Sequence, residues 1–478
     1  MAWGRPGLTK DLFGIDLRSL ALFRVGLGAV LLWELLDRMK GLEEHYTRDG
    51  LVPGPVLESL AAHPVYSLHL LGDTVAFQTT LFAIALVAAF MLTIGWRTRL
   101  ATVVSFVLIL SLHSRNPLLL HHGDSLIRFL LMWSMFLPLG ALVSVDAKRR
   151  SAPAIASPVL SIGSTALLLQ GFFVYLIAAI SKLQYDAWWE GRALYAVVHK
   201  ASYVRPLGEY VAQFPGILEF FTHATLFVEG AIPLLLFSPW RRDLCRVLAV
   251  LLGIGLHVSI FSVVDVGTFQ PITSLVLFPA LPASLWNRLG WRLEEGSTVG
   301  WSPRRWSEAL VGILLAYSVT SNALALGAGM HTMPESIQTV GRILRLDQRW
   351  RMFANTDITI QGWWVVIGKL DNGAEFNLLH GTPEVSLERP ERYYREMPNM
   401  AWRTYWASIS RDHYASFRPW MGRYFCRWWN RDAEPALQVQ AVRVIFVQEL
   451  NYKPELGGIV RPRQLVETNC RELDDAGL

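Results

Sequence analysis

The side chains best suited to chemistry in this sequence are ionisable residues at the ends of apolar segments. They are His121, His122, Asp124, Lys182, His257 and Asp265. An ionisable group among apolar side chains is costly unless it is paired or hydrated. A lysine in a partly dry pocket loses its charge more easily than in water, and only the neutral amine can accept a proton. We therefore predict Lys182 as a general base, with His121, His122 and His257 orienting or relaying protons.

Four of these residues also have a structural interpretation. Lys182 at a helix end is typical of an anchor whose amine reaches the lipid headgroups. His121 and His122 can cap the helix that follows them, and His257 can be held by a structural hydrogen bond. Arg24 lies away from this group, in the inner half of the first apolar segment, which favours helix packing or interior pairing.

The sequence lacks the motifs that are typical of other kinds of site. The adjacent His121 and His122 cannot easily direct both rings at one ion, no His-x-x-x-His spacing occurs, and the three cysteines have no Cys-x-x-Cys spacing, so no metal is expected. There is no Gly-x-Ser-x-Gly elbow and no glycine-rich phosphate loop. The basic residues lie in short clusters between apolar segments, so we expect no nucleic-acid partner.

Apolar stretches of the length that crosses a bilayer must position these residues. Hydrophobic residues make up 52% of the 478-residue chain, and the mean hydropathy is +0.30. The third stretch is short and the eighth contains three prolines, so both need packing from neighbours. The nine predicted spans are Leu17 to Leu36, Thr74 to Trp96, Thr98 to Leu112, Ser125 to Val145, Val159 to Ser181, Ile217 to Phe237, Leu244 to Val263, Val266 to Leu285 and Ser307 to Leu326.

The distribution of lysine and arginine orients these spans. Positive residues concentrate on the cytoplasmic side, and a model with the N-terminus inside places fifteen on the inner side against eight on the outer side. Met1 to Asp16 does not read as a removable signal peptide, so the first span serves as the insertion signal. Nine spans deliver the C-terminal region to the outside of the inner (plasma) membrane, where Cys426 and Cys470 can pair.

The region from residue 327 to 478 has mixed α and β patterns. Gly362 to Leu370 alternates apolar residues, Asp371-Asn372-Gly373 is a turn signal, and Ala374 to Leu379 can return as the partner strand. Val439 to Leu450 indicates another strand, and Trp402 to Trp429 has helical spacing. We predict an all-α polytopic helix bundle over residues 1 to 326 followed by a small α+β extracytoplasmic domain. Its aromatic residues either dock on the bundle or contact a partner or the headgroups.

Several segments together resemble a known family. They are Asp16 to Arg24, Tyr46 to Pro53, Val174 to Leu183 with Trp189-Glu190-Gly191, His257, Val266 to Phe269 and Phe278-Pro279. In order and spacing they are similar to the membrane region of the vitamin K-dependent gamma-carboxylase superfamily, which includes the bacterial HTTM (horizontally transferred transmembrane) domain proteins. The segment ending in Ser181-Lys182-Leu183 is similar to the one that bears the carboxylase's catalytic lysine, which places that role on Lys182.

The resemblance implies a reaction. The lysine deprotonates a reduced naphthoquinone, oxygen adds, and the strong base that results removes a proton from a glutamate side chain before carbon dioxide attacks. Quinone epoxide is the other product. We expect Asp124, Trp189 and Asp265 to contribute to substrate binding. Where the carboxylase has an Asn-Asn-His run, this chain has His121-His122-Gly123-Asp124, and Ser181 replaces a second lysine.

Two classes of function remain open. The first is a carboxylase-type membrane enzyme whose partners are membrane lipid, a lipid quinone and a glutamyl peptide or secreted protein. The second is a non-catalytic membrane factor that helps a peptide or secreted protein mature or cross the membrane, with the outer domain as its docking surface. A solute transporter would show paired broken helices with internal repeats, which the sequence lacks.

Overall fold

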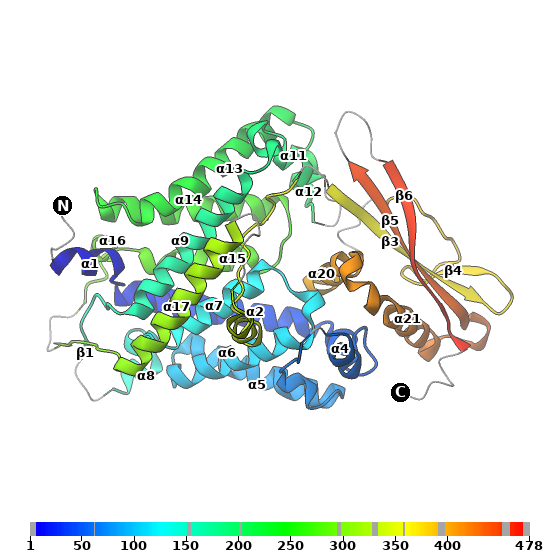
Figure 1. Cartoon of the computed structure of the whole chain (residues 1–478), viewed down its shortest axis with the longest axis horizontal. Coiled ribbons are helices and arrows are strands. Elements are labelled where there is room, and N and C mark those ends of the chain that lie inside the picture. The colour runs from blue at the N-terminus through cyan, green and yellow to red at the C-terminus, as the bar shows by residue number, and fades with distance from the viewer. Residues whose placement is uncertain are drawn as a thin grey trace.

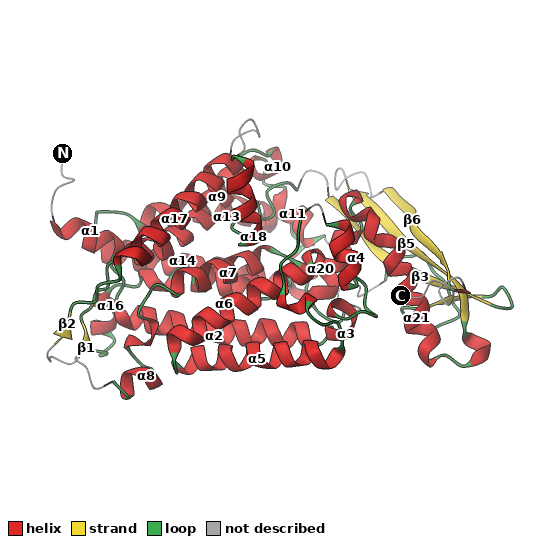
Figure 2. Cartoon of the chain, turned by 60° about the horizontal axis from the view of Figure 1, so that its bottom comes forward, coloured by secondary structure: helices red, strands yellow, loops and turns green. Residues whose placement is uncertain are grey.

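The computed structural model describes residues 6–61, 63–150, 154–199, 203–293, 298–326, 333–356, 359–390, 397–451 and 459–471. A long body of helices lies at one end of the molecule and a sheet at the other (Figures 1 and 2). The lysines and arginines counted to orient the spans include Arg5 and Lys200, which lie outside the described residues. The predicted domain boundary at 326/327 coincides with the end of a described range. The boundary therefore stays a prediction.

Within the described residues, six helices are long and apolar enough to cross a membrane. They match six of the nine predicted spans, so the chain is a multi-pass membrane protein. Many of their large apolar side chains remain exposed, and only 17% of the apolar window of the last helix is buried, as expected for faces that meet lipid. The six are α2 (Leu17–Met39), α5 (Val75–Ile94), α9 (Ile162–Lys182), α13 (Pro215–Leu236), α14 (Arg242–Val263) and α17 (Arg305–Leu326).

The other three predicted spans are not single long apolar helices, so six of the nine predicted spans are confirmed by length and composition. The third predicted span is helix α6 (Thr98–Arg115), which is polar near both ends. The fourth is divided into α7 (His122–Ser134), η3 (Leu139–Ala141) and α8 (Val145–Lys148), and the eighth into α15 (Phe269–Leu275), η4 (Phe278–Ala280) and α16 (Ala283–Arg288). Proline explains the breaks, because Pro138, Pro279 and Pro282 cannot donate the backbone bond that continues a helix.

The divided segments nevertheless run between the two ends of α2. Asp124 at the start of α7 is 2.7 Å from Arg38 near the end of α2. After η3, the backbone oxygen of Val143 accepts a hydrogen bond of 2.5 Å from Arg24 in the first half of α2. Arg24 thus satisfies carbonyl groups that the interrupted helix leaves free, which confirms its predicted packing role.

The α15–η4–α16 segment also runs between the two ends of α2. Thr268, just before α15, donates a hydrogen bond to Glu34 in the second half of α2. Asn287 in α16 accepts a bond of 2.7 Å from Arg18 at the start of α2. Each divided segment therefore begins near one end of α2 and finishes near the other.

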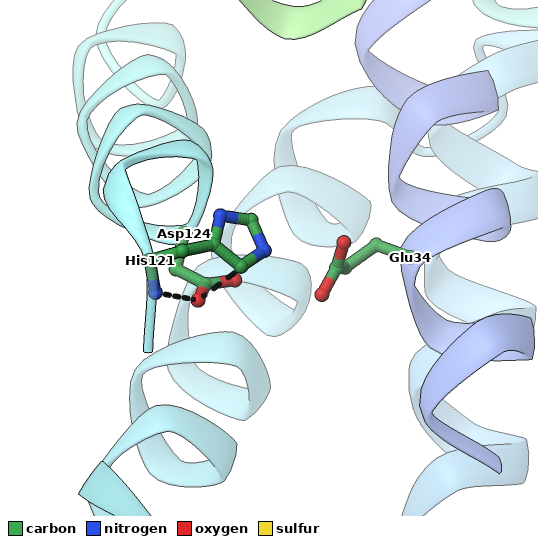
Figure 3. Close-up of side chains that lie close together, drawn as sticks. All are labelled: Glu34, His121 and Asp124. Carbon is green, nitrogen blue, oxygen red and sulfur yellow. Dashed lines mark hydrogen bonds and ion pairs between the residues drawn. The ribbon is translucent and has the colours of Figure 1, made fainter. Parts of the chain in front are cut away.

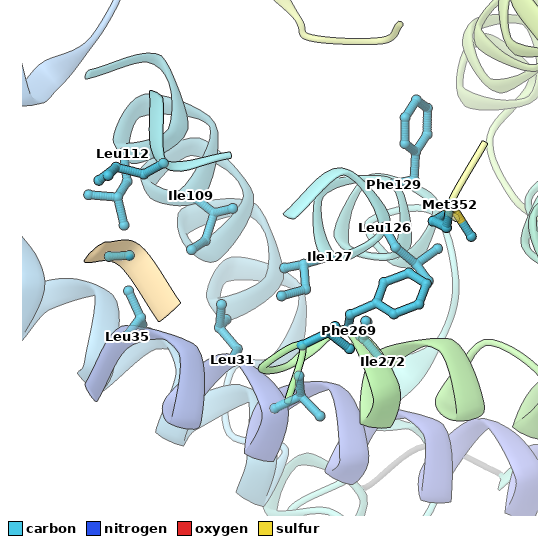
Figure 4. Packing of buried hydrophobic residues seen from close by; sticks show 14 of the residues in the cluster. Leu31, Leu35, Ile109, Leu112, Leu126, Ile127, Phe129, Phe269, Ile272 and Met352 are labelled. Atoms are coloured by element: carbon cyan, nitrogen blue, oxygen red, sulfur yellow. The ribbon is translucent and has the colours of Figure 1, made fainter. Parts of the chain in front are cut away.

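Apolar side chains from helices far apart in the sequence form the centre of the bundle. Figure 4 shows where α2, α6, α7 and α15 meet; the labelled residues are Leu31, Leu35, Ile109, Leu112, Leu126, Ile127, Phe129, Phe269, Ile272 and Met352. Met352 belongs to the irregular segment that follows α18 (Glu335–Ile343). Gln348 of that segment accepts a hydrogen bond of 2.9 Å from Gln170 in α9, so the segment threads into the bundle.

Short helices and one short strand pair lie between the longer elements. The strand pair departs from an all-α bundle: β1 (Ala154–Ile155) pairs in parallel with β2 (Thr298–Val299). The short helices are α1 (Pro6–Phe13), α3 (Leu42–Tyr46), α4 (Gly54–Leu60), η1 (Leu68–Leu70), η2 (Pro117–Leu119), α10 (Asp186–Trp189), α11 (Ala193–Val198), α12 (Pro206–Val211), α18 (Glu335–Ile343) and η6 (Pro435–Leu437).

The C-terminal region forms a four-stranded antiparallel sheet in the order β4-β3-β5-β6. The predicted hairpin is confirmed, with Gly373 in the turn at φ 82°, a conformation that favours glycine. The strand predicted from Val439 is also confirmed, whereas the sequence did not indicate the last strand. The strands are β3 (Thr359–Leu370), β4 (Glu375–Asn377), β5 (Val439–Asn451) and β6 (Ile459–Asn469).

Two helices lie beside this sheet, where the sequence predicted one (Figure 1). The segment from Trp402 to Trp429 is divided into α20 (Met400–Ile409), η5 (Asp412–Phe417) and α21 (Arg418–Asp432). Helix α20 also contacts the bundle, since Ser408 donates a bond of 2.8 Å to the Leu118 carbonyl.

Aromatic packing and a disulfide hold the sheet and these two helices together. The Trp364 ring of β3 lies 4.3 Å from that of Trp406 in α20. Cys426 of α21 and Cys470 after β6 form the disulfide that the sequence allowed. Many of the aromatic side chains therefore fill the interior of this region and its contact with the bundle.

Candidate functional site

The Lys182 amine is buried and paired with an acid that sequence reasoning did not single out. Lys182 is the last residue of α9, where the helix dipole favours a cation, and its side chain is 3% exposed. Its Nζ lies 2.7 and 3.0 Å from the two carboxylate oxygens of Glu229 in α13. The ring of Trp188 is 5.1 Å from the same Nζ. The amine therefore points into the protein, whereas the amine of a headgroup anchor would point outward.

This pair opens on a cavity of about 390 Å³ formed between α9, α13 and α14 and the segments that follow them. Its walls are mostly apolar, with polar groups of Lys182, Glu229, His257 and Gln270 among the lining residues. Met352 and Phe353 also line it. A largely apolar cavity with a few convergent polar groups is typical of a small-molecule site.

His257 lines the same cavity and belongs to a hydrogen-bond chain. Its Nδ1 lies 2.7 Å from Gln270 Oε1, and its Nε2 lies 2.9 Å from the Tyr175 hydroxyl. That hydroxyl is also 3.1 Å from the Thr273 carbonyl. Because an amide oxygen can only accept, Nδ1 carries a proton. The Tyr175 hydroxyl can therefore donate either to Nε2 or to the Thr273 carbonyl without moving any heavy atom.

His121 and Asp124 belong to a second, separate cluster at the start of α7. The His121 ring accepts a hydrogen bond of 3.0 Å from Gly123 N, and Asp124 accepts one of 2.8 Å from His121 N, which makes a reciprocal helix cap. Arg38 lies 2.7 Å from Asp124 and also pairs with Glu34. The structure thus gives His121 the capping role that the sequence also allowed.

The same cluster contains three potential metal ligands, Glu34, His121 and Asp124, whose donor atoms lie within 4.8 Å of one another. Figure 3 shows His121, just before α7, and Asp124, in its first turn, facing Glu34 on α2. Both carboxylates are already paired with Arg38, and Glu34 accepts a further hydrogen bond from Thr268. An arginine at the centre of the carboxylates makes this a buried ion-pair network, in which a cation would meet a positive charge.

His122 is influenced by charges of both clusters. It interacts with the backbone of Arg349, and it is close enough to both His121 and Lys182 for their charges to act on it. Among the described residues that line the cavity, neither His121 nor His122 appears. Of the four predicted catalytic residues, the structure therefore brings Lys182 and His257 to one cavity, whereas His121 and His122 do not line it.

Trp189 lies at the surface near the site. It is 59% exposed, and its ring N–H donates a bond of 2.9 Å to the Leu183 carbonyl. The neighbouring Trp188 contacts Lys182 instead, and its ring N–H is held by the carbonyls of Phe353 and Ala354 at 3.1 and 3.0 Å.

Asp265 connects the bundle to the C-terminal region. Its carboxylate lies 2.9 Å from Arg403 in α20 and 3.4 Å from Arg205. Burial acts to raise the pKa of the Asp265 carboxyl, but the two arginines and the Gly267 N–H together hold it below its usual range. Asp265 is not among the described residues that line the cavity.

The polar cavity residues that sequence reasoning missed include Glu229, Tyr175 and Gln270. Glu229 carried a usable signal, because an acid inside an apolar helix of 22 residues is costly without a partner. Tyr175 and Gln270 carried none, since their partners lie 82 and 13 residues away and only the fold brings them together.

Comparison with known families identifies one domain whose residues include the cavity helices. A family model described as the HTTM domain matches residues 14–286, more than half of the chain, and Lys182, Glu229 and His257 all lie inside the match. This domain is shared with vitamin K-dependent gamma-carboxylase. No curated protein and no solved structure matches the chain. The extent of the family match establishes that this membrane protein belongs to the HTTM domain family.

Proposed function

We propose that this chain is a membrane enzyme of the gamma-carboxylase type, in which Lys182 is the base that deprotonates a reduced naphthoquinone. The observation that carries the proposal is the Lys182 amine, buried and opening on an apolar cavity inside the segment matched by the family. Proton abstraction from a quinol needs a basic group next to a cavity that can hold the apolar ring, and the buried Lys182 amine has this position.

The cavity residues fit such a quinol. The volume of about 390 Å³ is in the range of small-molecule sites, and the apolar walls suit a fused aromatic ring. When bound, a reduced naphthoquinone would supply, with oxygen, the strong base that removes the glutamyl proton. The overall reaction converts quinol, oxygen, carbon dioxide and a glutamyl side chain into quinone epoxide, water and a carboxyglutamyl side chain.

Glu229 gives Lys182 a way to become a base. The ammonium form of Lys182 cannot accept a proton, but its proton can pass to the Glu229 carboxylate 2.7 Å away. The products of that transfer are a neutral amine and a neutral carboxylic acid, which an apolar cavity tolerates better than two separate charges. We assign Glu229 as the proton acceptor for Lys182. We assign His257, held by Gln270 and Tyr175, as a group that orients the bound quinol.

We also propose the orientation predicted from the sequence: nine crossings, with the N-terminus cytoplasmic and the C-terminal region outside the inner (plasma) membrane. The divided segments that run between the ends of α2 support nine crossings. The Cys426–Cys470 disulfide supports an oxidising compartment for the C-terminal region. This orientation puts Lys182 near the outer side, where a glutamyl peptide or secreted protein would approach.

The test uses purified protein in lipid nanodiscs with reduced naphthoquinone, oxygen, labelled bicarbonate and a glutamyl peptide. Loss of a general base lowers turnover by about 100-fold to 10,000-fold, so Lys182→Ala should remove most epoxide and label. Lys40→Ala is the matched control, because Lys40 is an exposed lysine paired with Asp37 at a distance of 2.9 Å.

Two results would contradict the proposal. One is the absence of both products above the Lys182→Ala background. The other is a Lys182→Ala protein that supports maturation or export of its partner as well as the unchanged chain, which is the outcome expected of a non-catalytic docking factor.

A further inference from the structure

A second cavity lies at the opposite end of the bundle, where α6 begins, η3 turns and the chain enters α17. Its volume is about 350 Å³. Three arginines line it: Arg99, Arg150 and Arg304. Within the part of the chain that the structure describes, none of their guanidinium groups has an ion pair or a hydrogen bond. Three unpaired cations around one cavity form an electrostatic site for an anion.

The acid in this cavity does not neutralise the arginines. Asp146 accepts hydrogen bonds of 2.8 Å from Arg97 N, 2.7 Å from Thr98 N and 2.6 Å from the Thr98 hydroxyl. Its carboxylate therefore holds the start of α6, and the balance of charge facing the cavity stays positive.

A buried hydroxyl gives an independent indication of a polar ligand. Ser134, the last residue of α7, lines the cavity and is 1% exposed. Its Oγ has no hydrogen-bond partner among the described residues. A buried hydroxyl without a partner costs free energy unless a ligand or water satisfies it.

We propose that this cavity binds the phosphodiester headgroup of an anionic phospholipid. Planar guanidinium groups match the geometry of phosphate oxygens. Leu100 and Val103 on α6 and Leu310 on α17 are exposed apolar side chains within three residues of residues that line the cavity, and they offer surface that acyl chains could contact. Basic pockets at the cytoplasmic ends of spans are suited to lipid headgroups. The site is separate from the Lys182 cavity and does not depend on the proposed chemistry.

Native mass spectrometry of the detergent-purified chain tests this proposal, with phosphatidylglycerol and phosphatidylcholine as probes. We expect phosphatidylglycerol to be retained at concentrations about tenfold lower than phosphatidylcholine. The triple variant Arg99→Gln, Arg150→Gln, Arg304→Gln should lose this preference. The matched control removes three positive charges from the same end but outside the cavity lining, in the variant Lys148→Gln, Arg149→Gln, Arg305→Gln, and should keep it.

Further variants and probes separate the remaining outcomes. Arg304→Gln alone, at an exposed position, and Ser134→Ala should each weaken phosphatidylglycerol binding by about twofold to fivefold, and they keep the test usable if the triple variant does not fold. Competition by inorganic phosphate or glycerophosphoglycerol as strong as that by intact lipid would assign the site to a free phosphate ester and overturn the lipid assignment. No preference in the unchanged chain, or equal loss in the control triple variant, would overturn the anion site itself.

Discussion

Lys182 and Glu229 hold each other's charge in a cavity whose walls are mostly apolar. Removing one partner leaves the other buried and unpaired, so Lys182→Met or Glu229→Leu should each lower the free energy of unfolding by about 3 to 5 kcal/mol. The double variant Lys182→Met with Glu229→Leu should recover most of that loss, because it removes both charges. Thermal unfolding of the four proteins in detergent measures the coupling. Additive losses in the double variant would show that the two residues are not a pair.

Asp265 makes a pH-dependent contribution to stability. Its pKa lies below the ordinary carboxyl value, despite the opposing effect of burial, because Arg403 and Arg205 favour the ionised form. A depressed folded-state pKa contributes stability at pH values above the unfolded value, and the contribution is lost as pH falls through the folded value. The stability difference between the unchanged chain and Asp265→Asn should therefore be constant near neutrality and shrink below about pH 4.

The measurement for Asp265 is thermal unfolding from about pH 7 to pH 3, within the range where carboxylates titrate. Asp371→Asn is the control, since Asp371 pairs with Arg471 on the exposed surface. A difference for Asp265→Asn that stays the same at all pH values would mean that the carboxylate charge does not hold this contact.

The residues of the site show what spacing along the chain can and cannot reveal. Lys182 and His257 stand out in the sequence because a charged group or an imidazole in an apolar segment is costly unless a partner or water satisfies it. Their partners do not stand out in the same way: Glu229 lies 47 residues from Lys182, on another helix, and only the packing of α9 against α13 brings the two together. A sequence pattern can indicate that a partner must exist, but the fold decides which residue it is.

At the scale of elements, the Cys426–Cys470 disulfide joins α21 to the end of β6 across 44 residues. A loop of that length corresponds to about 4 kcal/mol of stabilisation in the chain-entropy model. The double variant Cys426→Ser with Cys470→Ser should therefore make the C-terminal region markedly more sensitive to protease, and a reductant should have the same effect on the unchanged chain.

The third cysteine provides the control for this prediction. Cys245 is a free, buried cysteine in α14, so Cys245→Ser should leave the effect of the reductant unchanged. Equal protease sensitivity with and without reductant in the unchanged chain would contradict the stabilising role of the disulfide.

The elements that sequence patterns predicted well are those whose hydrophobic period continues without a break. The hairpin at Asp371-Asn372-Gly373 combines alternating strands with a turn residue at positive φ, and the structure contains it. The segments near Pro138 and Pro279 are apolar enough to suggest spans, yet they form short helices. Hydropathy indicates burial or membrane contact, whereas helix continuity also needs backbone donors, which proline removes.

At the scale of the whole molecule, the two-part organisation follows from composition, but the contact between the parts does not. Helix α20 joins the bundle through Ser408 on Leu118 and through Arg403 on Asp265. The segment after α18 that carries Gln348 and Met352 contacts the bundle and helps to enclose the Lys182 cavity. These contacts link residues more than 100 positions apart, which local patterns cannot reveal.

The number of crossings decides which side each loop occupies, and it can be measured. If only the six long apolar helices cross, Arg292 lies outside and Glu434 inside when the N-terminus is inside. Nine crossings place Arg292 inside and Glu434 outside. Both side chains are exposed, so single cysteines introduced there in a Cys245→Ser background can react with a membrane-impermeant maleimide applied to spheroplasts.

We expect the maleimide to label Glu434→Cys in intact spheroplasts and Arg292→Cys only after permeabilisation. Arg48→Cys and Arg149→Cys are the matched controls, because both models place Arg48 outside and Arg149 inside and both side chains are exposed. Labelling of Arg292→Cys without permeabilisation, together with protection of Glu434→Cys, would support six crossings. That outcome would also put the C-terminal region in the cytoplasm, where the Cys426–Cys470 disulfide would not be expected to persist. The side of the membrane and the chemistry of that disulfide therefore depend on the same count.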